Sequence, residues 1–193
     1  SSTGRAVPQD VAAHGNGGAF VAYDTGSSSR GAVFAVTNSG GVSWSYSDKG
    51  SAVSHLNAIV STKDGGCIAA GAWSQPGAIG QWTTRLSLAG KVMWSQRPPI
   101  ADGVSWQSIA ASGEVFIVAG SRLDKGLSSP VVAQIGGDGA SHWLRANTSI
   151  NGTINRHGIR VQPDGGLLLL GTSKQGTLQR ALAQRANRWG YSD

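Results

Sequence analysis

The stretch Asp64-Gly65-Gly66-Cys67-Ile68-Ala69-Ala70-Gly71 decides the fold, because its pattern occurs four times along the chain. Each copy is a polar turn with glycine followed by a short apolar run, which is typical of a hairpin turn that leads into a buried strand. The anchoring glycines are separated by 48, 48 and 52 residues, and they are Gly17, Gly65, Gly113 and Gly165. This spacing indicates a repeated structural unit.

A second motif follows the first in every copy. Gly40 precedes Trp44, Gly90 precedes Trp94, and Gly139 precedes Trp143, each by four residues. We assign Trp189 to the same place in the last copy, after a shortened turn. Two markers that recur in step predict one unit built four times, and the repeated tryptophans are expected to hold the outer strand on its sheet.

Each unit divides into four short apolar runs bounded by Gly, Pro, Asp or Ser. In the second unit these runs are residues 56–62, 66–73, 81–88 and 91–96. Four-stranded antiparallel units of this length are the signature of propeller blades. We therefore predict an all-β chain, a β-propeller of four four-stranded antiparallel blades with about 48 residues per blade.

The predicted domain organisation is a single propeller domain over residues 1–193, with blades at roughly 8–50, 51–99, 100–147 and 148–193. Four blades can close into a small ring, form half of an eight-bladed ring, or belong to a larger one. We expect the closed ring, because the four units use nearly all of the chain.

The pattern of Asp-Gly-Gly, apolar run, and Gly-x-x-x-Trp resembles the Asp-Gly-Gly β-propeller repeats of exported bacterial proteins. The second unit carries the resemblance best, with Asp64-Gly65-Gly66 and Gly90-Lys91-Val92-Met93-Trp94. The resemblance covers about residues 8–191 and departs from the pattern at Ser112-Gly113-Glu114. It implies the fold and no activity, because such repeats share structural residues only.

One segment favours a different structure. Residues 177–186 contain good helix formers, with Leu178, Ala181, Leu182 and Arg185 at helical spacing. The alignment of the repeats instead makes this segment the third strand of the last blade, and we predict a strand.

Candidate binding residues come from the places where each inner strand begins. In a propeller these segments gather at one end of the central channel, so side chains from different blades converge there. The candidates are Asp10, His55, Trp106, Arg156 and His157. The other interpretation of this set is ordinary loop decoration.

Catalysis and metal binding find little support in the sequence. The chain has a single glutamate, Glu114, in a turn, and no nucleophile elbow, phosphate loop or dinucleotide motif. The four histidines lack zinc spacing, and Cys67 has no cysteine partner. We therefore expect no catalytic residue, no metal, no cofactor and no enzymatic activity, although aspartates from different loops could form a hydrolytic pair.

Charge and composition bear on the partner. The net charge is +6, and residues 145–193 contribute +5 of it. A basic face favours an acidic partner, whereas no Lys/Arg run points to nucleic acid. Charged residues make up 13% of the chain, a low share that fits exported proteins, and no apolar run is long enough for a membrane helix.

The function expected from these features is a non-catalytic exported protein, periplasmic or extracellular. It would bind an acidic protein, as an inhibitor or neutralising partner, through loops at one end of the propeller. A carbohydrate-binding propeller with a polysaccharide partner is the first alternative. A small hydrolase, or a fragment of a larger propeller enzyme, is the second.

Overall fold

The structure is a computed structural model that describes residues 6–15, 17–25, 29–50, 53–98, 103–124, 126–146, 152–175 and 177–191. The side chains of residues 153–157, 174 and 175 lie outside this description.

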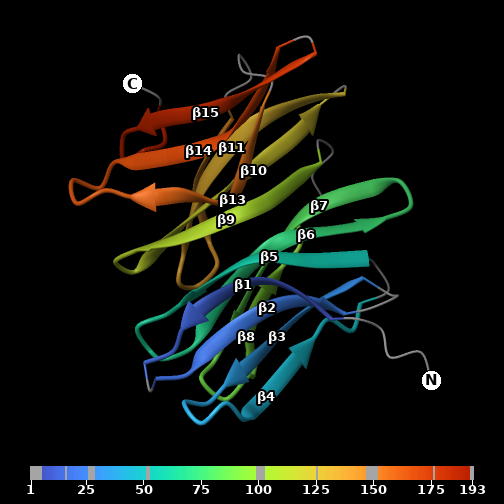
Figure 1. Ribbon diagram of the computed structural model, residues 1–193, viewed down its shortest axis with the longest axis vertical. Helices are drawn as coiled ribbons and strands as arrows, with labels where there is room; N and C mark the ends of the chain where they lie inside the picture. The colour runs from blue at the N-terminus through green and yellow to red at the C-terminus, as the bar shows by residue number, and fades with distance from the viewer. Residues whose placement is uncertain are drawn as a thin grey trace.

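Fifteen strands in the described part of the chain form four antiparallel sheets, drawn in Figure 1. The first sheet contains β1 (Val7–Ala13), β2 (Ala19–Thr25), β3 (Arg30–Val36) and β4 (Val42–Ser47). The second contains β5 (Val53–Ser61), β6 (Cys67–Gln75), β7 (Ala78–Leu86) and β8 (Val92–Gln96). The third contains β9 (Val104–Ser112), β10 (Val115–Asp124), β11 (Leu127–Gly136) and β12 (Ser141–Ala146). The fourth contains β13 (Gly152–Val161), β14 (Leu167–Gln175) and β15 (Leu178–Ala186).

Strands pair only with their neighbours in the sequence, so every sheet is an up-and-down meander. This is the predicted blade, with three strands of the fourth sheet in the described part of the chain, and the four sheets confirm the all-β propeller fold. The segment with helical spacing is the strand β15, which pairs with β14 along its whole length. Pairing with β14 therefore overrides the helix propensity of these residues.

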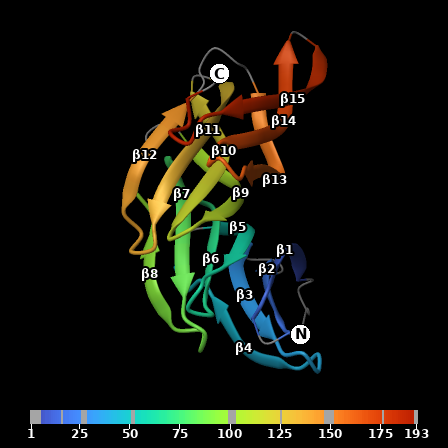
Figure 2. The same cartoon turned by 90° about the vertical axis from the view of Figure 1, so that its left-hand side faces the viewer.

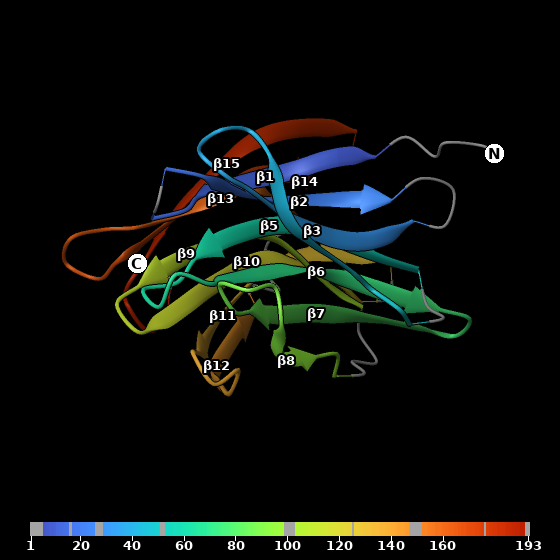
Figure 3. The ribbon, with the colours of Figure 1, turned by 90° about the horizontal axis from the view of Figure 1, so that it is seen from below.

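The blades follow one another along an open arc. The inner strand β1 packs against β5, β5 against β9, and β9 against β13, whereas no comparable packing joins the first and fourth blades within the described residues. The first blade and the fourth lie at opposite ends of the molecule in Figure 1. Figures 2 and 3 show the outer strands β8 and β12 on the side opposite the inner strands β1 and β13. The expectation of a closed four-bladed ring is therefore wrong.

The core is divided among the joints between blades. Three buried clusters lie between successive blades, because each middle strand sends alternate apolar side chains to its two faces. On β6, for example, Cys67 and Ala69 join the cluster shared with the first blade, and Ile68 and Ala70 join the one shared with the third. This explains why the second strand of each unit is a continuous apolar run.

Meandering strands give each blade two opposite rims. We call the rim where the inner strands begin, at Val7, Val53, Val104 and Gly152, the entry rim. The opposite rim, which carries the tight turns at Gly65 and Gly90, is the turn rim. Both turn glycines have positive φ, 82° and 75°, which only glycine adopts cheaply.

The structure corrects the position of Trp189. Backbone hydrogen bonds from Asn187 to Tyr191 and from Gly190 to Asn187 make the same turn as those from Ser87 to Lys91 and Gly90 to Ser87. Gly190 is thus the counterpart of Gly90, and Trp189 lies inside the turn. It is not the counterpart of Trp94.

Candidate functional site at the entry rim

A β-bulge interrupts every inner strand near the entry rim. The pairing register shifts at Gln9 in β1, at Asn57 in β5, at Gln107 in β9, and between Ile154 and Ile159 in β13. Bulges redirect side chains and are frequent next to active sites. In three of the four blades the extra residue carries an amide side chain.

Glycine opposite the bulge makes this backbone path available in the second and third blades. A Cβ on Gly71 would overlap the carbonyl oxygen of His55, and a Cβ on Gly120 would overlap that of Ser105. In these two blades the glycine that follows the apolar run therefore makes room for the bulged strand, and the bulge lies beside residues 55 and 105 at the entry rim.

Asp24 and His55 form a polar pair across the first and second blades. The Nδ1 atom of His55 lies 3.1 Å from Oδ2 of Asp24, and Nε2 of Gln9 donates a hydrogen bond of 2.8 Å to the same oxygen. The other carboxylate oxygen of Asp24 is buried without a hydrogen-bond partner. The side chain of Asp24 is 16% exposed and that of His55 is 41% exposed.

The distance between Nδ1 of His55 and Oδ2 of Asp24 is that of a hydrogen bond. With the carboxylate of Asp24 ionised, Nδ1 of His55 is the donor and Oδ2 of Asp24 the acceptor. The second ring nitrogen, Nε2, is then left to exchange a proton with a ligand or with water. An imidazole oriented in this way by a carboxylate is a common arrangement for general acid–base chemistry.

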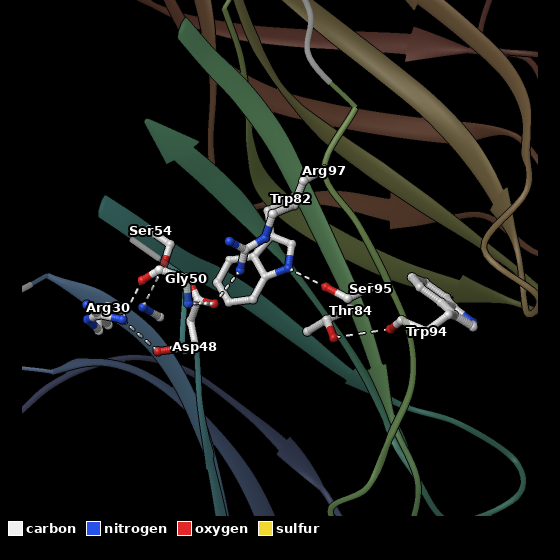
Figure 4. Close-up of polar contacts among 10 residues, drawn as sticks. Arg30, Asp48, Gly50, Ser54, Trp82, Thr84, Trp94, Ser95 and Arg97 are labelled. Atoms are coloured by element: carbon white, nitrogen blue, oxygen red, sulfur yellow. Dashed lines mark hydrogen bonds and ion pairs between the residues drawn. The ribbon is translucent and has the colours of Figure 1, made fainter. Parts of the chain in front are cut away.

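A buried network holds His55 in position from the neighbouring residue. Ser54 donates a hydrogen bond of 2.7 Å to Oδ2 of Asp48, and Arg97 makes an ion pair of 2.8 Å with Oδ1 of the same carboxylate. The guanidinium of Arg97 also lies 4.2 Å from the ring centroid of Trp82. Figure 4 shows this network at the joint between the first two blades.

The network is tied to the backbone of the first blade as well. Ser54 donates its amide to the carbonyl of Ser29 at 2.9 Å, and Arg30 donates to the carbonyls of Asp48 and Gly50. Burial alone would raise the pKa of Asp48, but hydrogen bonds from Arg97, Gly50 and Ser54 hold that pKa below its usual value. The carboxylate therefore stays charged and keeps the start of β5 in place.

The structure places the five predicted site residues in different environments. His55 lies at the entry rim with a half-exposed side chain. Asp10 is one step further along β1, where its carboxylate accepts hydrogen bonds from the amides of Val11 at 2.7 Å and Ile59 at 2.9 Å. Asp10 thus links β1 to β5.

Trp106 is not a surface residue. Its side chain is 2% exposed and belongs to the cluster between the second and third blades, and its carbonyl accepts a hydrogen bond of 2.8 Å from Asn57. The expectation that Trp106 stands in a loop at the channel mouth is corrected here, because it lies inside β9. Arg156 and His157 fall within the bulge of β13, and their side chains lie outside the described residues.

Sequence analysis missed Asp24 and Gln9. Asp24 stands outside the repeated motifs, at the end of the second strand. Because that strand runs antiparallel to the first, its last residues return to the rim where β1 and β5 begin. Strand direction was therefore the signal that could have found it.

Other chemistry in the described residues lies elsewhere. Glu114 stands on the turn rim, where it is highly exposed and pairs with Lys63 at 2.5 Å. No group of three metal-ligating side chains occurs in the described part of the chain. Among those residues, no helix is long and apolar enough to span a membrane.

Comparison with known proteins finds solved structures of similar fold. No family model matches the chain, and no curated protein matches it. Solved structures match the chain in fold. An endo-arabinase from Bacteroides thetaiotaomicron superposes with a TM-score of 0.58 at 10% sequence identity, over 91% of this chain and 72% of that one. A bifunctional GH43-CE protein from Bacteroides eggerthii gives a TM-score of 0.51 at 10% identity, over 91% of this chain and 24% of that one.

These likenesses contradict the prediction that the chain is not an enzyme. The endo-arabinase, whose fold is similar, is an enzyme by name, and that prediction is withdrawn. At 10% identity the likeness establishes the β-propeller fold, and it assigns no residue.

Proposed function

We propose that the chain forms part of a carbohydrate-acting hydrolase whose reactive groups lie at the entry rim. The Asp24–His55 pair carries the proposal, because it is an acid–base pair held by Gln9 and by the Asp48 network. The fold shared with the endo-arabinase supports a glycan as substrate. This corresponds to the second alternative predicted from the sequence, a hydrolase or a fragment of a propeller enzyme.

In the proposed reaction His55 acts on water. Nε2 takes a proton from a water molecule, whose oxygen attacks the anomeric carbon while the glycosidic C–O bond breaks. The leaving oxygen takes up a proton from a second group. Asp24 stabilises the imidazolium that forms, as a buried carboxylate does beside a catalytic histidine.

We propose that the second group is the protonated imidazole of His157, which falls within the bulge of β13, because the neighbouring Arg156 does not give up its proton. The bulges of β1, β5 and β9 all lie near the entry rim, at Gln9, Asn57 and Gln107. The inner strand β13 packs against β9, so its bulge is the next along the same rim. A polysaccharide partner fits this assignment better than an acidic protein does. Export, and membership of the Asp-Gly-Gly repeat family, remain predictions.

The test is hydrolysis by the full chain. Release of reducing ends is measured on linear arabinan and on a panel of other plant and bacterial polysaccharides, for the wild type and for Asp24→Asn and His55→Gln. We expect activity on at least one substrate and a fall of about 100- to 10,000-fold in each variant, the usual contribution of a general base.

The matched control is Asp138→Asn, an exposed aspartate in the turn between β11 and β12 on the turn rim, which should keep wild-type activity. Circular dichroism checks that all variants fold. Polysaccharide that binds without any release of reducing ends, or equal rates in Asp24→Asn and wild type, would contradict the proposal.

A further inference from the structure

The three joints between blades share one contact at the turn rim. A tryptophan of the outer strand lies against the turn glycine of the next blade. A Cβ added to that glycine would come within 2.5 Å of Trp44 at Gly90, 3.0 Å of Trp94 at Gly139 and 2.7 Å of Trp143 at Gly190. The repeated tryptophans therefore join a blade to the following blade, and do not merely hold the outer strand on its own sheet.

Hydrogen bonds to the next turn accompany this contact. Nε1 of Trp44 donates to the carbonyl of Leu88, and Nε1 of Trp94 donates to that of Gly137, each at 2.8 Å. Arg85 also donates to the carbonyl of Gly137, while Asp64 holds its guanidinium at 2.8 Å. The first two joints thus have a donating blade and an accepting turn, whereas Nε1 of Trp143 at the third joint is buried without a hydrogen-bond partner.

The buried clusters follow an equally regular rule. An alanine on the middle strand of one blade shares a cluster with a cross-strand pair on the first two strands of the next. The three sets are Ala22 with Ile59 and Ala69, Ala70 with Ile109 and Val118, and Ala119 with Ile159 and Leu169. All three alanines are fully buried.

Both ends of the arc present one half of such a joint. Leu170 is the fourth-blade counterpart of these alanines, and it is 43% exposed. On the first blade the corresponding pair is Val11 with Val21, and Val11 is 62% exposed. These exposures leave two apolar blade faces at the surface of the described structure.

The turn rim shows the same pair of halves. Arg185 is held by Asp164 at 3.0 Å, as Arg85 is held by Asp64, but its side chain is 64% exposed where that of Arg85 is 18% exposed. Gly40, the first-blade counterpart of Gly90, has no described atom within 4 Å of an added Cβ. The fourth blade therefore presents the arginine of a donating half, without an outer-strand tryptophan among its described residues, and the first blade presents an accepting half.

We propose that the fourth blade of one copy of this chain packs against the first blade of a second copy. A second copy is the occupant because one chain carries both matching surfaces, the exposed Leu170 with Arg185 at one end and the exposed Val11 with the open turn at Gly40 at the other. Leu170 would lie against Val11 and Val21 of the other copy. Arg185 would face the turn at Asn38 in the first blade of that copy. The contact joins unlike faces, so it builds a ring or a chain of copies. It does not depend on the proposed function.

Disulfide capture tests this contact directly. Val11→Cys and Leu170→Cys are prepared as separate proteins, mixed and oxidised, and disulfide-linked dimers are followed on non-reducing gels. We expect dimers to form at least ten times faster in the mixture than in either protein alone, because only unlike faces meet. The natural Cys67 gives little background, since burial, and to a lesser extent Asp64, raises the pKa of its thiol to about 12.

The control pairs Val11→Cys with Met93→Cys, on the outer strand β8. Met93 is 53% exposed and lies on neither end face. Equal rates in all mixtures, or faster capture in Val11→Cys alone, would overturn the proposal.

Light scattering supplies a second readout on the unmodified chain. We expect the mean mass to rise with concentration in the wild type and to stay near that of one chain in Leu170→Asp. Because Leu170 is already partly exposed, the aspartate variant should remain folded by circular dichroism. A wild type that remains monomeric up to 0.1–1 mM, about the highest range in which weak association matters, would also overturn the proposal.

Discussion

Asp48 is the residue on which the start of β5 depends. Its carboxylate is buried, it is bonded to Ser54 and Arg97, and its pKa is lowered. A group whose pKa is lowered in the folded state stabilises the fold above its ordinary pKa, near 4. That contribution is lost as the pH falls through the lowered value.

We predict that Asp48→Asn loses about 2–3 kcal/mol of unfolding free energy at pH 7, because Arg97 keeps its charge at a half-buried site without its partner. The variant should also lose less stability than the wild type between pH 6 and pH 3. Urea unfolding at a series of pH values measures both effects. Asp124→Asn serves as the control and should match the wild type, and parallel pH profiles for Asp48→Asn and the wild type would contradict the assignment.

At the scale of single residues, the sequence indicated where polar groups gather but not how they are used. His55 stands at the rim as expected, because its place at the start of an inner strand follows from the repeat. Trp106 occupies a nearly equivalent place and is buried, since one more residue of strand turns a side chain to the opposite face. Asp24 acquires its role only when β1, β2 and β5 lie side by side.

At the scale of elements, the turn glycines do more than permit a tight turn. Gly90 combines a φ of 75° with direct contact to the indole of Trp44. Gly77 has a similar φ of 80° and no described atom within 4 Å of an added Cβ. The two positions separate the cost of backbone strain from the cost of filling the joint.

We predict that Gly77→Ala costs about 1 kcal/mol, the strain of a left-handed alanine. Gly90→Ala should cost about 2–4 kcal/mol, because its methyl group also displaces the Trp44 ring. Chemical denaturation of both variants measures the difference. Equal losses would mean that the tryptophan contact does not join the blades.

Strand positions could be predicted from the sequence because turns and apolar runs repeat. The repeat predicts β15 as a strand although its residues are good helix formers. The last turn was misaligned because Trp189 matched the residue type of the outer-strand motif. The turn glycines Gly40, Gly90, Gly139 and Gly190 are separated by 50, 49 and 51 residues. Gly190 is therefore the residue that keeps the period of the repeat. Backbone hydrogen bonding, and not side-chain identity, defines that turn.

At the scale of the whole molecule, the repeat predicts blades but not their closure. Closure depends on the small rotation between one blade and the next, which is set by packing at the joints and has no local sequence signal. The described blades therefore form an arc with an accepting face at the first blade and a donating face at the fourth. The entry rim of this arc gathers Gln9, Asp24 and His55.

The central claim is that a glycan binds at the entry rim, and the histidines allow a direct test. His55 lies at that rim, whereas His14 and His142 lie at the turn rim, next to the ends of β1 and β12. The measurement is the imidazole nitrogen NMR spectrum of the full chain, recorded while the oligosaccharide obtained in the hydrolysis assay, or linear arabino-oligosaccharide, is added. We predict that the His55 signals shift in a saturable way while those of His14 and His142 stay in place. Shifts at His14 or His142 with His55 unchanged would contradict the account.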